Sequence, residues 1–580
     1  MNQDTTAPPV YQSVKLWEEA GAQAATALSK YLELSLSLER HCLLDATPPA
    51  YLAARIDSAL SSLHSVLNHH ISEARSTLAQ TRNRVRSPIY CFPEEVLSEI
   101  FSYAVSNAAE SPFSFMDTVD ATVIKTHHQL HTLLGVCSVW RNIALNQTEL
   151  WTVVPIVNTL LRTGNWIDAQ FSRIITRSIE RAGTKGLHLA VTQSCNSRVL
   201  ATLRDFTSRF HTVNIDAGEL TISHIMDMFL HPTSPTSPTL SQLSLRQERE
   251  PAYFEQIPRE FNSLFGSSSD EQSSFADLVQ NLSALRISGV QLSWDRMSFS
   301  QQLTELLLHN VLLGYDSKLN LLSDALSAAT ELQDLKLISV RTFYDFTIDT
   351  DVRLPYAPTI FLPNLQTFVI QDLYFNTLKF LFSLLNSSCS HCLTLVLNEK
   401  GESVHYPGFI QAIDREDLDQ LVLSNDIPLD TLFIDWGLAF ATQRQQLSAL
   451  GLGSLIRSVP TLEKLYLRWF TFNKEYCEAI KRPSQGPDSD FPHLTELYLH
   501  MVKIQNKTAF KAMIASHLQS LEYLEVGGTV VSNHEDPEEL VTIEEDEELV
   551  TWLTDNDLSF RIVYGSHCPR QFDKLRWLLW

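Results

Sequence analysis

Three short parts of this sequence hold side chains that could bind a metal ion. Cys389 and Cys392 have the spacing of one half of a zinc site, and the pairs His69–His70 and His127–His128 offer imidazoles. A zinc site needs a second ligand pair, and no such pair lies near Cys389 and Cys392 in the sequence. Cys392 also falls on an apolar repeat position. We therefore expect a buried structural thiol there and no metal site.

The short motifs of the common enzyme classes are missing as well. The sequence has no G-x-S-x-G, no P-loop and no H-E-x-x-H. Gly451–Ser454 (GLGS) lacks the third glycine of a dinucleotide-binding loop, and we expect a turn there. The sequence therefore predicts a protein that is not an enzyme and that needs no cofactor.

Composition narrows the classes of partner. The chain has 580 residues, 44% hydrophobic and 19% charged, with a net charge of −23, which argues against nucleic acid or anionic membrane as the main partner. No apolar run reaches about 18 residues, and the first residues lack a secretory pattern. The eight cysteines have no regular spacing, so we expect reduced thiols and a cytoplasmic or nuclear protein.

The first part of the chain is predicted to form long helices. Val14–Leu44 is rich in Ala and Leu, and the apolar residues from Leu52 to Leu78 step by 4, 4, 3, 4, 4, 3 and 4. This spacing predicts a helix with one apolar stripe, which ends at Ser87–Pro88 because the residue before Pro avoids the α region. The stripe could form a self-associating coiled coil, or it could pack against the first helix.

A second, shorter helical unit follows. Pro93 is expected at the first helical position, Glu94 and Glu95 in the first turn, and an apolar stripe from Val96 to Ala104 after them. A polar loop is predicted over Ser106–Gln129 and a helix over Leu130–Ala144. That helix is apolar on two sides, and about 65 residues cannot enclose both. One side should therefore meet the rest of the chain or another protein.

The remaining sequence repeats the pattern L-x-x-L-x-L with substitutions. Twelve copies start at residues 184, 210, 240, 282, 303, 332, 365, 392, 429, 462, 494 and 521, about 31 residues apart. Apolar residues at offsets 3 and 5 fill the inner side of a short strand, and the chain returns by a helix or loop such as 316–330 or 507–518. The pattern predicts a curved parallel sheet with the helices outside.

The strand positions between these leucines predict a binding face. Tyr466 and Tyr498 share offset 4 in successive repeats and should stack as neighbours, with Glu463, Lys464, Glu496, Glu522 and Tyr523 beside them. Aromatic and charged side chains on a concave face are typical of partner recognition. The candidate substrate-binding residues are Lys464, Tyr466, Tyr498 and Tyr523. The alternative is that these side chains merely tolerate exposure to solvent and bind no partner.

The repeats resemble the leucine-rich-repeat family without its usual Asn at offset 8. That position holds Val290, Val311, Val340, Leu373, Phe470 and Val502, and offset 10 holds Leu292, Leu313, Phe472, Ile504 and Val531. We expect hydrophobic packing in place of the Asn ladder. His231–Thr239 and Phe265–Ser274 are expected to be loops, with a phosphorylation site at Ser234 or Ser237 less favoured than a passive role. Glu535–Asp557, with eleven acidic residues and no Lys or Arg, is expected to be a solvated acidic loop.

The short helical unit resembles an F-box. Phe92-Pro93-x-Glu95-Val96-Leu97-x-x-Ile100-Phe101, Val136-Cys137-x-x-Trp140-Arg141 and Leu150-Trp151 follow the order of the family pattern. The combination with an upstream helix and degenerate repeats is similar to a group of F-box proteins expanded in fungi. We predict an N-terminal helical region over 1–87, an F-box-like domain over 88–154, a leucine-rich-repeat solenoid over 155–532, and an acidic segment and cap over 533–580.

The resemblance implies the partners. An F-box docks on the Skp adaptor of a cullin–RING ubiquitin ligase, and the repeats would then hold a protein substrate. The implied adaptor-binding residues, some of which must instead form the core of the unit, are Phe92, Pro93, Glu95, Val96, Leu97, Ile100, Phe101, Leu133, Val136, Cys137, Trp140 and Trp151. The alternative is a leucine-rich-repeat scaffold or regulatory protein whose F-box-like unit is only structural.

Overall fold

The structure is a computed structural model of the chain. It describes residues 12–44, 48–86, 89, 92–106, 119–157, 167–193, 197–231, 240–247, 264–265, 269–294, 297–346, 362–384, 392–407, 409–413, 429–435, 448–483, 491–531, 540–556 and 558–563. Contacts divide it into two compact units, Met1–Leu97 and Ser98–Trp580, and the division falls inside one helix. Helices and a mostly parallel sheet account for the described residues, as the sequence predicts for its fold class.

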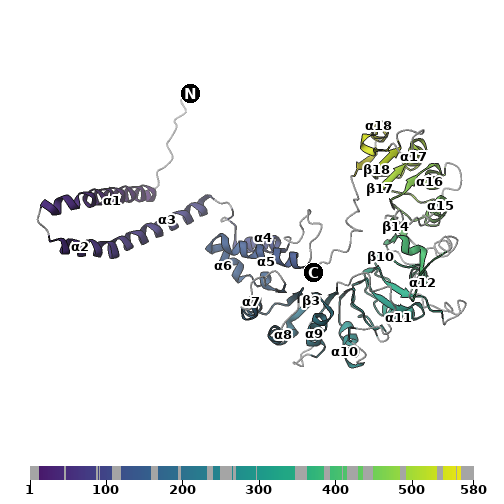
Figure 1. Ribbon diagram of the computed structural model, residues 1–580, viewed down its shortest axis with the longest axis horizontal. Coiled ribbons are helices and arrows are strands. Elements are labelled where there is room, and N and C mark those ends of the chain that lie inside the picture. Colours follow the sequence, from purple (N-terminus) through teal and green to yellow (C-terminus); the bar gives the residue numbers. More distant parts are fainter. Residues whose placement is uncertain are drawn as a thin grey trace. The chain divides into compact units, whose positions relative to one another are not determined.

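The first unit is a helical hairpin. Helix α1 covers Gln12–Leu44, and a second arm runs through α2 (Pro49–Ser58), the π-helical turn η1 (Ala59–Leu63) and α3 (His64–Arg86) (Figure 1). Pro49 occupies the first helical position, where its missing N–H is harmless. Helix α3 ends at Arg86, as the Ser87–Pro88 step predicts.

The π-helical turn keeps the apolar stripe of the second arm in line. The steps from Leu52 to Leu78 average about 3.7 residues, more than the 3.6 of an α-helix, so the stripe drifts by roughly 80°. A π-helical turn takes up about one extra residue, or roughly 100° of rotation. The turn at Ala59–Leu63 therefore returns the stripe to one side of the arm.

Helix α4 (Glu94–Ser106) begins one residue later than predicted. The carbonyl oxygen of Pro93 accepts the first intrahelical hydrogen bond from the Leu97 N–H, at 3.1 Å, which makes Pro93 the N-cap residue. Glu94 and Glu95 then stand in the first turn, where their charge favours the positive end of the helix dipole.

The prediction for the segment after α4 was partly wrong. Helix α5 covers Val119–Val136, so residues 119–129 are helical where a loop was expected. Its buried stripe of Val123, Thr126, Leu130 and Leu133 has helical spacing, and the sequence argument missed it because polar residues dominate between these positions. The expected single helix over 130–144 is also broken. Cys137 is extended and caps α6 (Ser138–Asn146), with its Sγ accepting from the Trp140 N–H at 3.4 Å.

A curved, mostly parallel sheet forms the rest of the described chain (Figure 1). Along its path lie β1 (Val153–Ile156), β2 (Leu187–Val191), β3 (Phe210–Asp216), β4 (Gln242–Arg246), β5 (Ala284–Ser288), β6 (Glu305–His309), β8 (Asp334–Ile338), β10 (Thr367–Gln371), β11 (Cys392–Leu397), β14 (Leu429–Asp435), β15 (Lys464–Arg468), β17 (Glu496–Ile504), β18 (Tyr523–Val531) and β19 (Leu540–Thr542). Strand β20 (Ser559–Ile562) pairs with β18 in parallel, while β19 pairs with it antiparallel. Every predicted repeat contributes one strand, in order.

Helices follow the strands on the outer side of the arc (Figure 1). They are α7 (Ile167–Arg181), α8 (Ser197–Arg204), α9 (Glu219–Leu230), α10 (Ser269–Val279), α11 (Leu319–Ser327), α12 (Phe375–Leu384), α15 (Ala449–Arg457), α16 (Lys474–Ile480), α17 (Lys507–Ala515) and α18 (Glu547–Asp555). The segments 316–330 and 507–518 contain α11 and α17, as predicted. Gly451–Ser454 lies inside α15, so the predicted turn was wrong: the Ser448 hydroxyl caps this helix, and Gly453 allows it to approach Ala479 closely.

The repeat registers were correct except at two strands. A bulge in the pairing of β2 with β3 places Leu189, not Leu187, beside Val213, so the first repeat starts at Gly186. Strand β11 places Leu393 beside Phe368 but Leu395 beside Leu432, with a second bulge between them. The register therefore changes by two residues across β11. The sheet tolerates this change because a two-residue slip keeps the same side chains facing inward.

Seven of the repeats carry a residue of positive φ at or near the end of the strand pattern. Offset 7 has a positive φ in Gly289, Asn310, Ser339, Asp372, Trp469, Met501 and Gly528. This conformation turns the chain so that offsets 8 and 10 point back into the core. All the residues predicted there are buried, with Val290 and Phe472 fully enclosed. The predicted replacement of an Asn ladder by hydrophobic packing is confirmed. At some repeats the segment pairs again, as in β7 (Leu312–Tyr315) with β9 (Arg341–Phe343) and β16 (Thr471–Phe472) with β17.

The acidic C-terminal segment is folded where it is described. Residues 540–556 form β19, a 3₁₀ turn and α18, not the expected solvated loop. The Asp546 carboxylate caps α18 by accepting from the Leu549 N–H at 2.9 Å, and it also pairs with Lys507. Glu548 pairs with Lys511 at 2.7 Å. Lysines of α17, distant in sequence, thus neutralise charges that seemed unbalanced.

The inserted loops are only partly described. Residues 232–239, with Ser234 and Ser237, lie outside the described residues, as do residues 266–268. Ser269–Ser274 belongs to α10, so the second expected loop is helical at its end. Cys389 and the side chain of Cys392 also lie outside what is described. The three boundaries between the four domains taken from the sequence stay predictions.

Candidate protein-interaction surfaces

The residues implied by the F-box resemblance separate into buried and exposed sets. Leu97, Phe101, Leu133 and Trp151 are buried, with 1 to 6% of their surface exposed. The Trp151 indole N–H donates to the Ala144 carbonyl oxygen at 2.8 Å, and the Arg181 guanidinium lies 4.2 Å from the ring centroid. These residues belong to the core of the helical unit.

Two more motif residues are half-buried and hold the helices together. The Trp140 ring lies 4.9 Å from that of Phe101, which joins α6 to α4. Cys137 is the cap that separates α5 from α6. Gln147, which the sequence argument did not consider, donates from its amide to the Ser98 carbonyl oxygen at 3.0 Å and to the Ser102 hydroxyl at 2.7 Å. This residue fastens the loop after α6 to α4.

The other motif residues face solvent. Phe92 is 47% exposed, Val96 and Ile100 are each 40% exposed, and Val136 is 53% exposed. Pro93 and Glu95 are exposed too. Helical spacing places Val96, Ile100 and Tyr103 on one side of α4, roughly 110° around the helix from Leu97 and Phe101. Tyr103, 71% exposed, was missed by the sequence argument because it lies outside the family pattern. We call Val96, Ile100 and Tyr103 the α4 stripe.

The second apolar side of the helical unit meets the sheet. Val123 of α5 forms a buried cluster with Val157, Ala190 and Leu307, and the Thr192 hydroxyl donates to the Asp120 carboxylate. Ala190 and Leu307 both sit at offset 4, on the side of the sheet away from the outer helices. Helix α5 therefore covers the beginning of the concave face. His127 in the same helix, expected in a loop, is half-buried, and its loss of hydration together with the nearby His131 lowers its pKa to about 4.

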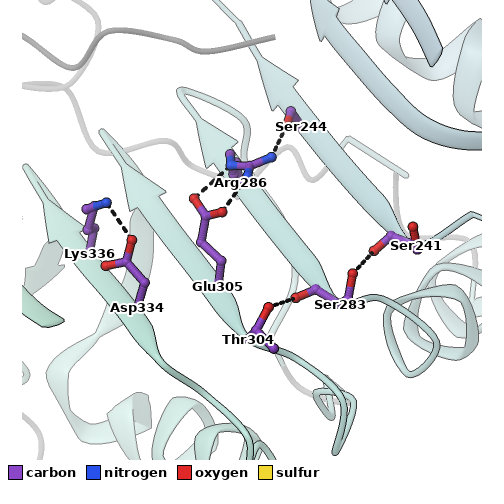
Figure 2. A network of polar contacts seen from close by, with 8 residues as sticks. All are labelled: Ser241, Ser244, Ser283, Arg286, Thr304, Glu305, Asp334 and Lys336. Carbon is purple, nitrogen blue, oxygen red and sulfur yellow. Dashed lines mark hydrogen bonds and ion pairs between the residues drawn. The ribbon is translucent and has the colours of Figure 1, made fainter. Parts of the chain in front are cut away.

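The middle of the concave face is polar (Figure 2). The Arg286 guanidinium forms a bidentate contact with the Glu305 carboxylate and reaches the Ser244 hydroxyl at 3.4 Å, while Lys336 pairs with Asp334 at 2.6 Å. The hydroxyls of Ser283 and Thr304 donate to the carbonyl oxygens of Ser241 and Ser283, which stand just before β4 and β5. Arg286 on β5 pairs with Glu305 on β6, and Lys336 pairs with Asp334 within β8, so these four residues neutralise one another's charge.

The far end of the concave face is aromatic. The rings of Tyr466 and Tyr498 stack at 4.0 Å with 8° between their planes, which confirms that they are neighbours. Tyr523 lies 5.6 Å beyond Tyr498, and Phe433 lies 5.9 Å from Tyr466 on the other side. Tyr466 is 2% exposed and packs in a cluster with Val396 and Phe433. Of the predicted substrate-binding residues, Lys464, Tyr498 and Tyr523 are therefore partly exposed. Tyr466 is buried and packs its ring against that of Tyr498.

Charges fix the tyrosines of this aromatic end. The Tyr498 hydroxyl donates to the Glu496 carboxylate at 2.6 Å, and Lys464 pairs with the same carboxylate at 2.8 Å. Burial and the hydrogen bond to Glu496 raise the pKa of Tyr498. Burial would raise the pKa of Glu496, but the hydrogen bonds from Lys464 and Tyr498 outweigh it and lower that pKa below its ordinary value. Tyr523 donates to Glu525 in the same manner, at 2.9 Å. The rings are thus held in fixed orientations, as suits a binding surface.

Neither a metal site nor a membrane span is found among the described residues. No group of three or more His, Cys, Asp or Glu side chains there could hold a metal ion. In the same part of the chain, no helix is long and apolar enough to cross a bilayer. His69 and His70 lie on the exposed side of α3.

Comparison with known proteins identifies no family. No family model matches the chain, and no curated protein matches it. Among solved structures it is similar to the crystal structure of the Rad7 and Elc1 complex in yeast, with 11% identity over 82% of this chain and 95% of that chain. The TM-score of 0.31 is too low for this similarity to support an argument about fold or function.

Proposed function

We propose that this chain is the substrate-recognition subunit of a Skp–cullin–F-box ubiquitin ligase, without catalytic activity of its own. The observation that carries the proposal is the division of the F-box motif. Its buried members build a helical unit, while Val96 and Ile100 stay exposed beside Tyr103 on the α4 stripe. Apolar side chains gathered on one exposed helix face are typical of a protein-binding surface.

The proposed adaptor contact is the α4 stripe. Its three side chains expose between 40 and 71% of their surface although all carry large apolar groups. A Skp-type adaptor would cover them, and through it a cullin–RING ligase would supply the transfer chemistry. Such an assembly acts in the cytoplasm or nucleus.

The proposed substrate contact is the aromatic end of the concave face. Tyr498, Tyr523 and Lys464 present rigid, partly exposed groups there. Helix α5 covers the opposite end, and the middle is occupied by internal ion pairs. The substrate is a protein that contacts aromatic rings at this end. We expect its contact surface to carry little net charge, because the charged groups of the concave face are paired with one another.

Co-purification of the full chain with the Skp adaptor tests the proposal. Ile100→Asp together with Val96→Asp should reduce adaptor binding at least tenfold, because both carboxylates would be buried without a partner. Leu97→Asp is unsuitable, since Leu97 is only 3% exposed and its replacement would disrupt the core. Leu220→Asp in α9 is a matched control, because Leu220 is an apolar side chain 77% exposed outside the motif. Failure of the unchanged protein to bind the adaptor would overturn the proposal.

One observation favours an alternative. The cluster of Val123 with Val157, Ala190 and Leu307 joins the helical unit firmly to the repeats. This is what a leucine-rich-repeat scaffold or regulatory protein needs if its F-box-like unit serves only as a cap for the sheet. A protein that keeps its cellular partners but never binds a Skp adaptor would support this alternative.

A further inference from the structure

The N-terminal hairpin leaves its apolar side chains uncovered. No side chain described between Gln12 and Arg86 is buried. Large apolar residues that are at least 37% exposed occur along both arms: Val14, Leu16, Trp17, Leu28, Tyr31, Leu32, Leu34, Leu36, Leu38, Tyr51, Ile56, Leu60, Leu63, Val66, Ile71, Leu78 and Val85. Together they expose on the order of a thousand Å² per hairpin, which reaches the roughly 800 Å² per partner of a stable interface.

The end of α1 is apolar over too wide an arc for one neighbour. At 100° per residue, Leu28, Tyr31, Leu32, Leu34, Leu36 and Leu38 cover about 200° of the helix surface, whereas a helix that packs on one side needs about 100°. The second arm of the hairpin can cover only part of this arc. Another helix must cover the remainder.

The contact between the two arms shows which part of the apolar arc of α1 stays uncovered. The Tyr31 hydroxyl lies 3.2 Å from the His64 Nε2, and their rings are 5.9 Å apart, so the Tyr31 side of α1 faces α3. Leu32 and Leu36 point about 100° and 140° away from Tyr31. They are 60 and 76% exposed, more than Tyr31 at 37%. The hairpin cannot cover this side of α1 with its own second arm.

This outer side of α1 has a regular stripe that suits a copy of itself. Val14, Trp17, Gly21, Ala25, Leu28, Leu32 and Leu36 step by 3, 4, 4, 3, 4 and 4 residues, the same rhythm as the stripe of the second arm. In an antiparallel crossing at Gly21, the large Trp17 of each copy lies against the small Ala25 of the other. A β-carbon built at Gly21 meets no atom within 4 Å, so this side of the helix is open. A self-complementary stripe is what a two-fold interface requires.

We propose that two copies of this chain associate through their N-terminal hairpins into a four-helix bundle, with the outer stripes of α1 at its centre. Each hairpin then supplies two helices, and each α1 gains the second neighbour that its wide apolar arc requires. The proposal is independent of the function proposed above, because it concerns residues 12–86 and not the adaptor or substrate contacts.

Sedimentation equilibrium of the full chain, over a range of concentrations, tests the proposal. The expected mass is twice that of the 65.7 kDa chain. Leu32→Glu with Leu36→Glu should raise the dimer dissociation constant at least tenfold. Gln23→Glu with Thr26→Glu adds the same charge to exposed polar positions on the other side of α1 and should leave that constant unchanged.

A second variant distinguishes weaker dimerisation from a loss of helical structure. Leu32→Ala with Leu36→Ala removes apolar surface without lowering helix propensity, since Ala is the best helix former. This variant should keep its far-UV helix signal and still dimerise several-fold more weakly. A wild-type chain that stays monomeric at all concentrations would overturn the proposal, even if it captured a different protein. Equal dimerisation of the wild type and the Leu32→Glu, Leu36→Glu variant would overturn it as well.

Discussion

The N-terminal hairpin and the repeat sheet both contain regularly spaced leucines, but these side chains are exposed in the hairpin and buried in the sheet. Both are rich in leucine at regular spacing, and both form the elements that this spacing predicts. In the sheet, Leu306 and Leu465 are fully buried between strands and outer helices. In the hairpin, Leu60 is 55% and Leu36 is 76% exposed. Periodicity therefore decides which element forms, whereas burial depends on whether another element of the chain covers it.

The difference follows from how the two parts stack. Each repeat lies between two others, so its apolar side is covered as soon as its neighbours fold. Within its described residues the hairpin has two arms and no third element, and a helix that is apolar over more than half its circumference cannot be covered by one neighbour. The following experiments test this contrast, in order of decreasing effect.

Acid should affect the repeat region most strongly. Burial lowers the pKa of His309, His405 and His517, all in the repeat region, to about 4, well below the ordinary value of 6.5. Between these values the unfolded chain binds more protons than the folded chain, so stability falls as pH drops from 6.5 toward 4. The thermal midpoint of the repeat region, followed by near-UV circular dichroism, should decrease steadily over this range.

A variant identifies the source of the acid effect. His517→Gln keeps a donor for the Ile480 carbonyl oxygen, which lies 3.0 Å from the His517 Nε2, but removes the titrating group. It should show a shallower dependence of the midpoint on pH. A midpoint that is the same at pH 6.5 and pH 4 would contradict the burial of these histidines.

Truncation of one leucine in each part should give unequal losses. Leu306→Ala should lower the free energy of unfolding by about 2–5 kcal/mol, because it leaves a cavity in the sheet core. Leu60→Ala should change it by roughly 0.5 kcal/mol or less in the monomeric chain, because Leu60 is already exposed. Urea unfolding of both variants at low protein concentration measures the difference. Equal losses would mean that the hairpin has a core of its own.

Glycine substitutions should have opposite signs in the two parts. Gly289 has a φ of +69°, and a β-carbon there would lie 2.1 Å from the Gln247 carbonyl oxygen, so Gly289→Ala should cost about 1–3 kcal/mol. Gly21 lies inside α1 with open space around it, so Gly21→Ala should raise the helix signal and stabilise α1 by about 1 kcal/mol. Thermal unfolding followed at 222 nm measures both. Destabilisation by Gly21→Ala in the monomer would show that another segment of the chain already covers this side.

Local patterns predicted the elements and much of the sheet. Pro88 and Pro93 fixed the end of one helix and the start of the next to within one residue, since Pro restricts its neighbours whatever the tertiary structure. The apolar pairs at offsets 3 and 5 located every repeat strand. They could not locate the bulges at β2 and β11, because a two-residue shift leaves the inward pattern unchanged.

The adaptor and substrate candidates were predictable as residues but not as surfaces. The F-box pattern named Val96, Leu97, Ile100 and Phe101 together, and only packing separates the exposed pair from the buried pair. Tyr103 carries no motif signal, although its spacing of three residues from Ile100 could have revealed it. The neighbouring positions of Tyr466 and Tyr498 followed from the repeat, whereas the burial of Tyr466 depends on Phe433 and Val396.

The sequence by itself determined the helices of the two N-terminal arms, the start of α4, the order of the strands and the apolar positions that replace the Asn ladder. These features arise from local conformational preferences and from the period of the apolar residues, which act over a few neighbours. Only the tertiary structure decided that α5 covers the beginning of the concave face and that Lys507 and Lys511 fold the acidic segment onto α17. Both outcomes depend on contacts between residues far apart in the chain, whose meeting no local pattern encodes.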